Sequence, residues 1–219
     1  MRPLSPTDVA RRIARDSPDG SYVNLGIGLP TLVADVVGPD KEIVYHSENG
    51  ILGMGPAPPP GTGDPELVNA GKQPVTLVTG GAYVHHTDAF VMMRGGHLDV
   101  SVLGAFQVSE TGDLANWATD EAALPPAVGG AMDLAVGAKR VLVMTTHTTR
   151  DGRPKLVARC TYPLTAAAVV DRVYTDLAVL DVGPEGFVVR EVAPGVPPDA
   201  LQAVTGARLT FPSDVAVLG

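Results

Sequence analysis

Short apolar runs rich in β-branched residues recur along this chain, and helix-like segments separate several of them. Each run is bounded by Gly, Pro, Asp or Asn, as strands that end in turns usually are. The runs occupy residues 21–26, 42–47, 74–80, 98–109, 140–147 and 172–182. The helix-like segments occupy residues 30–37, 84–95, 129–138 and 164–171. This alternation predicts an α/β fold with a mostly parallel, open sheet that helices cover on both faces.

The two ends of the chain carry local signals of their own. Ser5 and Asp8 have the spacing of a capping box, with Pro6 at the first helical position. We therefore expect a first helix that runs to about Arg15. Residues 186–214 predict a strand, a Pro-rich turn and a short capped helix.

Composition excludes several classes of function. The 219 residues are 45% hydrophobic and 18% charged, which is typical of a folded protein, and we expect one domain, 1–219. The formal net charge is -8 and the sequence contains no run of basic residues, which argues against nucleic-acid binding. No apolar stretch is long enough for a membrane span or an export signal, so we expect a cytoplasmic protein. Cys160 has no second cysteine to pair with, and we expect a structural role for it.

A glycine turn follows the first predicted strand. Gly26 and Gly28 precede a helix-like segment that Pro30 and Thr31 open. Bare backbone amides and a helix dipole at this point favour an anion. A dinucleotide site is one interpretation, because Glu48 lies 20 residues beyond Gly28 and could hold a ribose hydroxyl. The third glycine of that fingerprint is missing, however, which weakens this interpretation.

Glu48 is the more informative residue. It follows a predicted strand and directly precedes Asn49 and Gly50, a strong turn dipeptide. The Gly- and Pro-rich stretch that follows, 50–65, predicts a long loop without a regular element. Glu48 would thus lie at the carboxyl edge of the sheet, where α/β folds bind ligands, with Asn24 near the tip of the neighbouring strand. It is either a solvated turn residue or a carboxylate that attacks an activated acyl group.

Other candidate groups form no recognised pattern. The histidines lack metal-site spacing and have no cysteine beside them, so we predict no metal site. Trp117 would either stack on a ligand or anchor a core or an interface.

Four stretches of the chain together resemble one enzyme family. They are "VNLGIGLPTLV", "HSENGILGMGP", "VSVLGAFQVSETGDLANW" and "GGAMDLAVGAKRVLVMTTHTTRDGRPKLV". They resemble the B subunit of the family I 3-oxoacid CoA-transferases, which includes the succinyl-CoA:3-ketoacid and 3-oxoadipate enzymes. The resemblance covers roughly Thr7 to Leu209.

The resemblance implies a role for several residues. Glu48 matches the family nucleophile, which attacks an acyl-CoA and becomes a glutamyl-CoA thioester in a ping-pong scheme. Asn24 matches an asparagine near the reacting carbonyl, and Lys72 matches a lysine that positions substrate or carboxylate. The turn Gly129, Gly130 and Ala131 matches a loop whose amides stabilise an oxyanion. CoA thioester would be the substrate, with no resident cofactor.

The resemblance also implies a partner. The family's A subunit supplies much of the CoA site, and this sequence has no second half of that kind. We therefore expect a separate A chain and an A2B2 assembly. The alternatives are an acyl-CoA hydrolase, a sugar-phosphate isomerase-like enzyme, or a non-catalytic acyl-CoA-binding domain.

Overall fold

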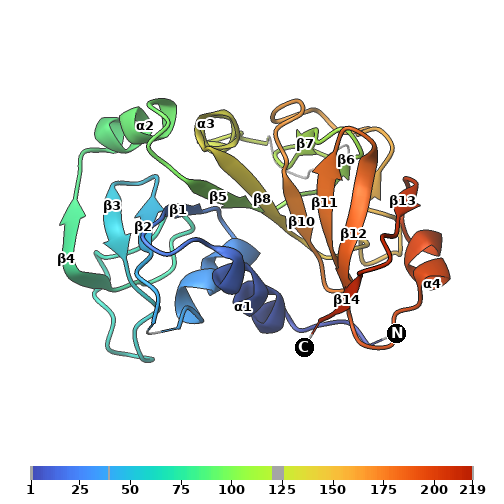
Figure 1. The fold of residues 1–219 in the computed structure, drawn as a ribbon. Coiled ribbons are helices and arrows are strands. Elements are labelled where there is room, and N and C mark those ends of the chain that lie inside the picture. Colours follow the sequence, from blue (N-terminus) through green and yellow to red (C-terminus); the bar gives the residue numbers. More distant parts are fainter. Residues whose placement is uncertain (1, 39, 120–125, 219) are drawn as a thin grey trace.

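The computed structural model describes residues 2–38, 40–119 and 126–218, and a long twisted sheet organises them (Figure 1). The order of strands in this sheet is β13-β12-β11-β10-β8-β5-β1-β2-β3-β4, and β14 also pairs with β12. A small sheet of order β7-β6-β9 lies beside it. The strands are β1 Tyr22–Leu25, β2 Val44–Ser47, β3 Ile51–Met54, β4 Leu77–Tyr83, β5 Val100–Leu103, β6 Gln107–Ser109, β7 Leu114–Ala115, β8 Arg140–Met144, β9 Leu156–Val157, β10 Arg172–Tyr174, β11 Ala178–Gly183, β12 Gly186–Val192, β13 Leu209–Thr210 and β14 Ala216–Val217.

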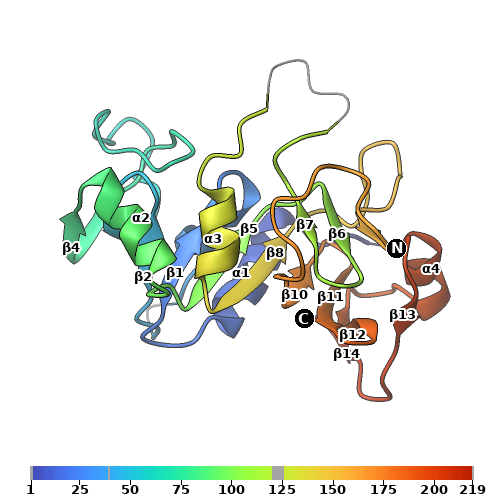
Figure 2. The same ribbon diagram turned by 90° about the horizontal axis from the view of Figure 1, so that it is seen from above.

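Helices lie on both faces of the main sheet. They are α1 Pro6–Asp16, the 3-10 helix η1 Leu29–Asp35, α2 His86–Arg94, α3 Ala131–Gly137 and α4 Pro198–Ala203. Helix α1 packs against η1 on one face, whereas α2 and α3 pack together on the other (Figures 1 and 2). The α/β fold class with a mostly parallel sheet is confirmed. No helix in the described ranges is long and apolar enough to cross a bilayer.

The centre of the sheet is parallel. Strands β2, β1, β5, β8 and β10 pair in parallel, so their carboxyl ends lie along one edge. Antiparallel strands flank this centre, with β3 and β4 on one side and β11 and β12 on the other. The parallel centre is therefore the part of the sheet that gathers loops at a common edge.

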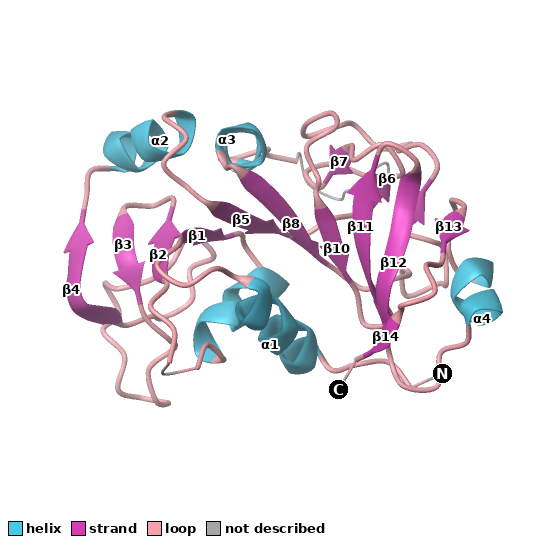
Figure 3. Cartoon of the chain, in the orientation of Figure 1, coloured by secondary structure: helices cyan, strands magenta, loops and turns pink. Residues whose placement is uncertain are grey.

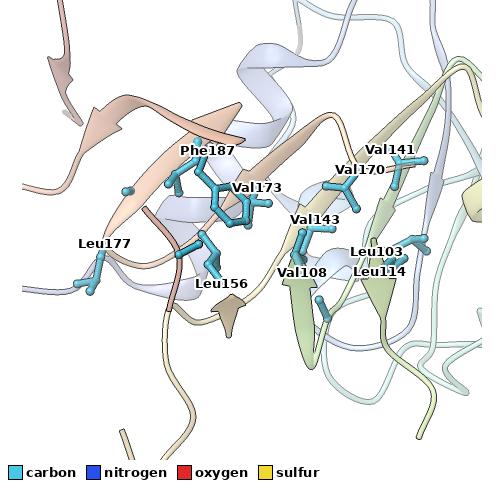
Figure 4. Packing of buried hydrophobic residues seen from close by; sticks show 14 of the residues in the cluster. Leu103, Val108, Leu114, Val141, Val143, Leu156, Val170, Val173, Leu177 and Phe187 are labelled. Atoms are coloured by element: carbon cyan, nitrogen blue, oxygen red, sulfur yellow. The ribbon is translucent and has the colours of Figure 1, made fainter. Parts of the chain in front are cut away.

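Alternate side chains of β8, at the centre of the sheet, contribute to two separate cores. On β8, Val141 and Val143 contribute to the core beneath α2 and α3. Leu142 and Met144 of the same strand contribute to the core beneath α1. Figure 4 shows part of the first core, where Phe187 packs with side chains of the small sheet and β8. This two-sided burial explains why the strands appear as continuous apolar runs in the sequence.

The first helix forms as its capping box predicts. The Ser5 side chain accepts a hydrogen bond from the Asp8 amide, and Pro6 occupies the first helical position. The apolar positions Val9 and Ile13 lie one turn apart and are buried against the sheet. The strand, turn and short helix predicted for 186–214 are also present, as β12 and α4.

Two local predictions were wrong, and a third element is helical but of another type. Residues 164–171 form no helix, because Ala166 bridges to Leu114 and the Val169 amide bonds to the carbonyl of Gly112. Residues 51–54, expected within a loop, form β3, which pairs with both β2 and β4. The segment after the glycine turn is a 3-10 helix, not an α-helix. Figure 3 shows how much of the chain between these elements is loop.

The loop that follows β3 is closed at its base. The Gly55 amide donates to the Thr76 carbonyl at 2.7 Å, and the Thr76 amide donates to the Pro56 carbonyl at 3.1 Å. Residues 57–75 therefore leave the sheet and return to it at the same place.

Candidate active site

Glu48 lies in the turn that joins β2 to β3, at the carboxyl edge of the parallel centre. The Gly50 amide donates to the Ser47 carbonyl at 3.0 Å, and Gly50 has φ +109°. A side-chain carbon at Gly50 would overlap the carbonyl oxygen of Val84. Glycine is therefore required here for both the turn and the close approach of the segment before α2.

The carboxylate of Glu48 lies against the turn that begins α3. A carbon added at Gly130 would be 2.5 Å from Oε2 of Glu48, and one at Gly129 would be 4.0 Å from Oε1. Gly129 and Gly130 thus have no side chain between their backbone and this carboxylate. The sequence places Gly130 and Glu48 far apart, and the sheet topology brings them into contact.

Burial of the Glu48 carboxyl raises its pKa above the ordinary value of 4.5. Contact with the Gly130 backbone and the charge of His86 lower the pKa, and the charge of Asp133 raises it. Burial dominates, because no arginine or lysine in the described ranges forms a salt bridge with Glu48. A partly desolvated carboxylate without a cationic partner is more basic, and more nucleophilic, than one in water.

Glu48 lines a cavity of about 410 Å³ at the carboxyl ends of β1, β5 and β8. Gly26, Gly129, Gly130 and Ala131 line it too. A cavity of this size is within the range of small-molecule sites. Its wall is largely apolar and includes Leu103, Ala105, Phe106, Leu134 and Met144.

A second depression of about 450 Å³ lies beside α1, away from Glu48. Its lysine, Lys41, already donates to the carbonyls of Ala14, Arg15 and Ser17 at the end of α1. These contacts cap the helix, so this depression has a structural explanation.

Asn24 does not line the cavity. It is 1% exposed, and its amide nitrogen lies 2.9 Å from Nδ1 of His46 and donates to the His46 carbonyl at 3.1 Å. Its Oδ1 atom is buried and has no hydrogen-bond partner in the described part of the chain. Burial lowers the pKa of His46 to about 4, so the imidazole is neutral at pH 7 and Nδ1 accepts from Asn24.

Lys72 and Asn49 lie outside the cavity, in a loop and a turn that hydrogen bonds hold together. Asn49 donates to the Val68 carbonyl at 2.8 Å, and the Ala70 amide donates to the Ser47 hydroxyl at 3.1 Å. These bonds fasten the loop of Lys72 to the turn of Glu48. Lys72 itself has φ +61°, a left-handed conformation that is uncommon for a lysine.

Gly28 also lies outside the cavity. It has φ +92° and precedes η1, where its carbonyl accepts from the Thr31 amide at 3.1 Å. Gly26 is the member of the turn that reaches the site. Its amide donates to the Val102 carbonyl at 2.8 Å, and a side-chain carbon there would lie 3.1 Å from that oxygen.

Two groups that line the cavity were not predicted as ligands. Lys155 lies between β8 and β9, and Asn116 directly follows β7. Both residues lie in stretches that carry the family resemblance, but nothing in those stretches marks either one as a ligand. The folding of the small sheet over β8 brings them to the cavity of Glu48. Trp117, left open between two roles, also lines the cavity, and its ring nitrogen donates to the Leu164 carbonyl at 3.2 Å.

His147 and the cysteine have structural surroundings. His147 is fully buried between the hydroxyls of Thr175 and Thr205. The Cys160 thiol is half-buried, and burial raises its pKa to about 11. No group of three or more metal-ligating side chains is found within the described ranges.

The fold and the site define an α/β protein that presents a partly desolvated carboxylate and a glycine turn in one ligand-sized cavity. The family model of coenzyme A transferases matches residues 7–203. The chain therefore belongs to the coenzyme A transferase family, and the family expected from the sequence is confirmed.

Relatives in this family are similar along nearly their whole length. The chain is 61% identical over 206 residues to the B subunit of 3-oxoadipate CoA-transferase from Pseudomonas putida, covering 94% of this chain and 96% of that one. It is 44% identical to the B subunit of succinyl-CoA:3-ketoacid coenzyme A transferase from Helicobacter pylori, covering 91% and 96%. The family and these relatives make the chain a CoA-transferase.

Solved structures support the fold. An acyl-CoA transferase of Escherichia coli O157:H7, solved as a thioester complex with CoA, matches with a TM-score of 0.77 and 21% identity. The match covers 100% of this chain and 44% of that one, so this chain spans less than half of its length. Glutaconate coenzyme A-transferase of Acidaminococcus fermentans matches with a TM-score of 0.70 and 17% identity, covering 99% and 89%.

Proposed function

We propose that this chain is the catalytic B subunit of a CoA-transferase that moves CoA from succinyl-CoA to a 3-oxoacid, acetoacetate or 3-oxoadipate. The observation that carries the proposal is the carboxylate of Glu48, which is half-buried, is in contact with Gly130 and forms no salt bridge with a lysine or arginine of the described ranges. The names of the two relatives support the choice of substrates.

The reaction would begin with attack of a Glu48 carboxylate oxygen on the thioester carbonyl of succinyl-CoA. The C–S bond breaks, CoA leaves as thiolate, and a mixed anhydride of Glu48 and succinate forms. The thiolate then attacks the glutamyl carbonyl and releases succinate, which leaves a glutamyl-CoA thioester. The acceptor acid repeats these two steps in reverse order and leaves as its CoA thioester, so Glu48 is regenerated.

The site explains how this sequence of steps avoids loss to water. In this proposal each tetrahedral intermediate carries an oxyanion that backbone amides of residues 129–131 stabilise, and the closeness of Gly130 to the Glu48 carboxylate supports this role. The apolar wall of the cavity limits the water around the anhydride and the thioester. No resident cofactor is required, because the thioester itself supplies the activation.

Asn24 and Lys72 have supporting roles in this proposal. Asn24 is buried on β1 and bonded to His46, two residues before Glu48. We assign it a positioning role, through the strand that ends at Glu48. The loop of Lys72 is hydrogen-bonded to the turn of Glu48, and we assign Lys72 a positioning role through that connection.

The proposal includes a separate A subunit in an A2B2 assembly, with this chain as a single domain of a cytoplasmic enzyme. Apolar side chains at and near the open side of the cavity support a partner there. Ile27 is 63% exposed, and Leu29, Phe106 and Met132 are each about 40% exposed. A cluster of this kind beside a site favours a protein contact.

The test is to detect the glutamyl-CoA thioester. The chain is co-expressed with its A subunit, incubated with succinyl-CoA, digested and analysed by mass spectrometry. We expect a CoA adduct on the peptide that contains Glu48 and loss of transfer in Glu48→Ala. Glu66→Ala is the matched control, because Glu66 is exposed on the neighbouring loop. If no label is exchanged between the acyl-CoA and free acid, the proposal is rejected. That result would indicate a hydrolase or a non-catalytic binding protein.

A further inference from the structure

A lysine ammonium shares the cavity of Glu48 and has no part in the chemistry described so far. Lys155 lines the cavity and directly precedes β9. Its backbone is fixed on both sides, because its amide donates to the His147 carbonyl at 3.1 Å and its carbonyl accepts from the Val108 amide at 2.9 Å. The side chain therefore starts from a rigid position on the small sheet.

The ammonium has one hydrogen-bond partner and free capacity for more. Nζ of Lys155 donates to the hydroxyl of Thr145 at 3.1 Å, and that hydroxyl donates to the Ala105 carbonyl at 3.0 Å. Since the proton of Thr145 is committed to the carbonyl, its oxygen accepts from the ammonium. An ammonium has three N–H donors, and within the described ranges no salt bridge occupies the other two.

The surroundings of Lys155 make its positive charge unfavourable when no ligand is bound. Lys155 is half-buried, and burial lowers its pKa, while the charge of Asp176 raises it. Within the described ranges no salt bridge joins Asp176 to Lys155, and the Asp176 carboxylate accepts from the His147 amide at 2.7 Å. A half-buried ammonium facing a cavity is stabilised when an anion enters and bonds to it.

The residues that line the cavity indicate which anion Lys155 would bind. Glu48 reaches the cavity from the β2–β3 turn and Lys155 from the small sheet, and the side chains of Leu103, Ala105 and Met144 also line it. An acyl group with its carbonyl at Glu48 would place its hydrocarbon chain along these apolar residues. Asn116 adds a polar group at this wall, with its amide nitrogen donating to the Gly104 carbonyl at 3.1 Å.

We propose that Lys155 binds the distal carboxylate of a dicarboxylic acyl group and so selects dicarboxylic over monocarboxylic substrates of the same length. The inference rests on the proposed function, because it places the reacting end of the acyl group at Glu48. It assigns specificity to Lys155, and it assigns no bond-making step to it.

The first experiment compares succinyl-CoA with butyryl-CoA, which has the same chain length and lacks the distal carboxylate. The complex with the A subunit is assayed with one fixed acceptor. We expect Lys155→Met to lower the ratio of kcat/KM for succinyl-CoA to that for butyryl-CoA by about 10- to 100-fold, the range for one hydrogen bond to a charged group. Lys155→Arg, which keeps the charge, should restore part of this ratio.

Lys139→Met is the matched control. Lys139 lies just before β8, at the other end of the strand, and is exposed and paired with Asp99 at 2.7 Å. Its loss should leave the ratio unchanged. If Lys155→Met lowers kcat/KM equally for succinyl-CoA and butyryl-CoA, the inference is overturned and Lys155 has a general structural role.

A second measurement does not depend on turnover or on the variant. Binding of succinate and butyrate to the unaltered complex is measured by calorimetry, together with competition by each acid. We expect succinate to bind at least about tenfold more tightly, as one charge-assisted hydrogen bond allows. Equal affinities would overturn the inference even if the glutamyl-CoA adduct forms, whereas preference for succinate without any adduct would support it and reject the proposed function.

Discussion

Two half-buried carboxylates of this chain, Asp16 and Glu48, have pKa values shifted in opposite directions. Burial would raise the pKa of Asp16, at the end of α1, but hydrogen bonds from Tyr174 and Arg12 outweigh burial and lower it. Tyr174 donates to Asp16 at 2.6 Å, and Arg172 donates at 2.9 Å. Burial of Glu48 raises its pKa, and the weaker contacts with Gly130 and His86 do not reverse the change.

The difference shows that partners, not burial alone, decide what a carboxylate does. Asp16 belongs to a network in which Arg12 also binds Glu191 and Arg172 also binds Asp181. These contacts join α1 to β10, β11 and β12, so the charge of Asp16 stabilises the fold. Glu48 lacks such partners, and its basicity is available for chemistry.

Among variants that test the contrast between Asp16 and Glu48, we expect the largest effect from Gly130→Ala, which disturbs the Glu48 carboxylate. Gly130 has φ -82°, so alanine is not strained by the backbone. Its methyl carbon would be 2.5 Å from Oε2 of Glu48 and would displace it. We expect transfer activity to fall about 100-fold, as for a displacement of about 1 Å.

The measurement for Gly130→Ala is steady-state transfer by the complex, alongside its thermal unfolding. Gly183→Ala is the control, because Gly183 lies at the end of β11 and a carbon there approaches no atom closer than 4.0 Å. If Gly130→Ala keeps full activity, the contact between this turn and Glu48 has no functional importance.

Asp16→Asn disturbs the paired carboxylate, and its effect should be on stability. Removing one charge leaves Arg12 and Arg172 with one partner fewer. We expect a loss of about 1–3 kcal/mol, between the values for exposed and buried pairs, because the Asp16 side chain is 22% exposed. Chemical unfolding at pH 7 measures it, and activity of the folded enzyme should not change.

The same variant has a defined pH dependence. The folded pKa of Asp16 is lowered, so its stabilising contribution is present above the unfolded pKa of about 3.9 and is lost as pH falls through the folded value. The variant and the unaltered protein should therefore converge in stability in acid. Asp151→Asn, an exposed pair with Arg153, should show little loss at either pH.

The smallest expected effect is a gain in stability from Glu48→Gln. The pKa of Glu48 is higher in the folded than in the unfolded state, so the folded state favours the protonated side chain. This contribution to the free energy of unfolding is complete below the unfolded pKa and is lost as pH rises through the folded pKa. At pH 7 the ionised carboxylate is the less favourable buried form. We expect the glutamine variant to be more stable by up to about 1 kcal/mol at pH 7, with a smaller gain below pH 4.5.

Unfolding of Glu48→Gln at the two pH values measures this gain. A loss of stability at pH 7 would show that Glu48 contributes to the fold as Asp16 does, and the contrast between the two sites would disappear.

The sequence patterns predict the elements that depend on local signals. The capping box of Ser5 and Asp8 gives α1, and the dipeptide Asn49-Gly50 gives the turn that carries Glu48. The segment 164–171 shows the limit of such signals. Its alanines favour a helix, but its backbone bonds to Leu114 and Gly112 instead.

The candidate site was predictable only in part, for the same reason. Glu48 and the turn of Gly129 and Gly130 lie in recognisable stretches, and the structure brings them into contact. Lys155 lies in the same stretch as Gly129, but no local signal marks it as a ligand, because its position in the cavity depends on the pairing of β6 with β9. Side chains that tertiary contacts alone deliver to a site leave no pattern in the sequence.

The closed base of the loop between Gly55 and Thr76 has a consequence for how this protein can vary. Since the two ends of residues 57–75 are pinned to each other, a change in the length of the tip around Gly61 need not be transmitted to β3 or β4. An inserted epitope or a shortened tip would alter the outer surface and leave the anchorage of Glu48 as it is. The chain thus has a tolerant segment next to a turn that admits almost no change.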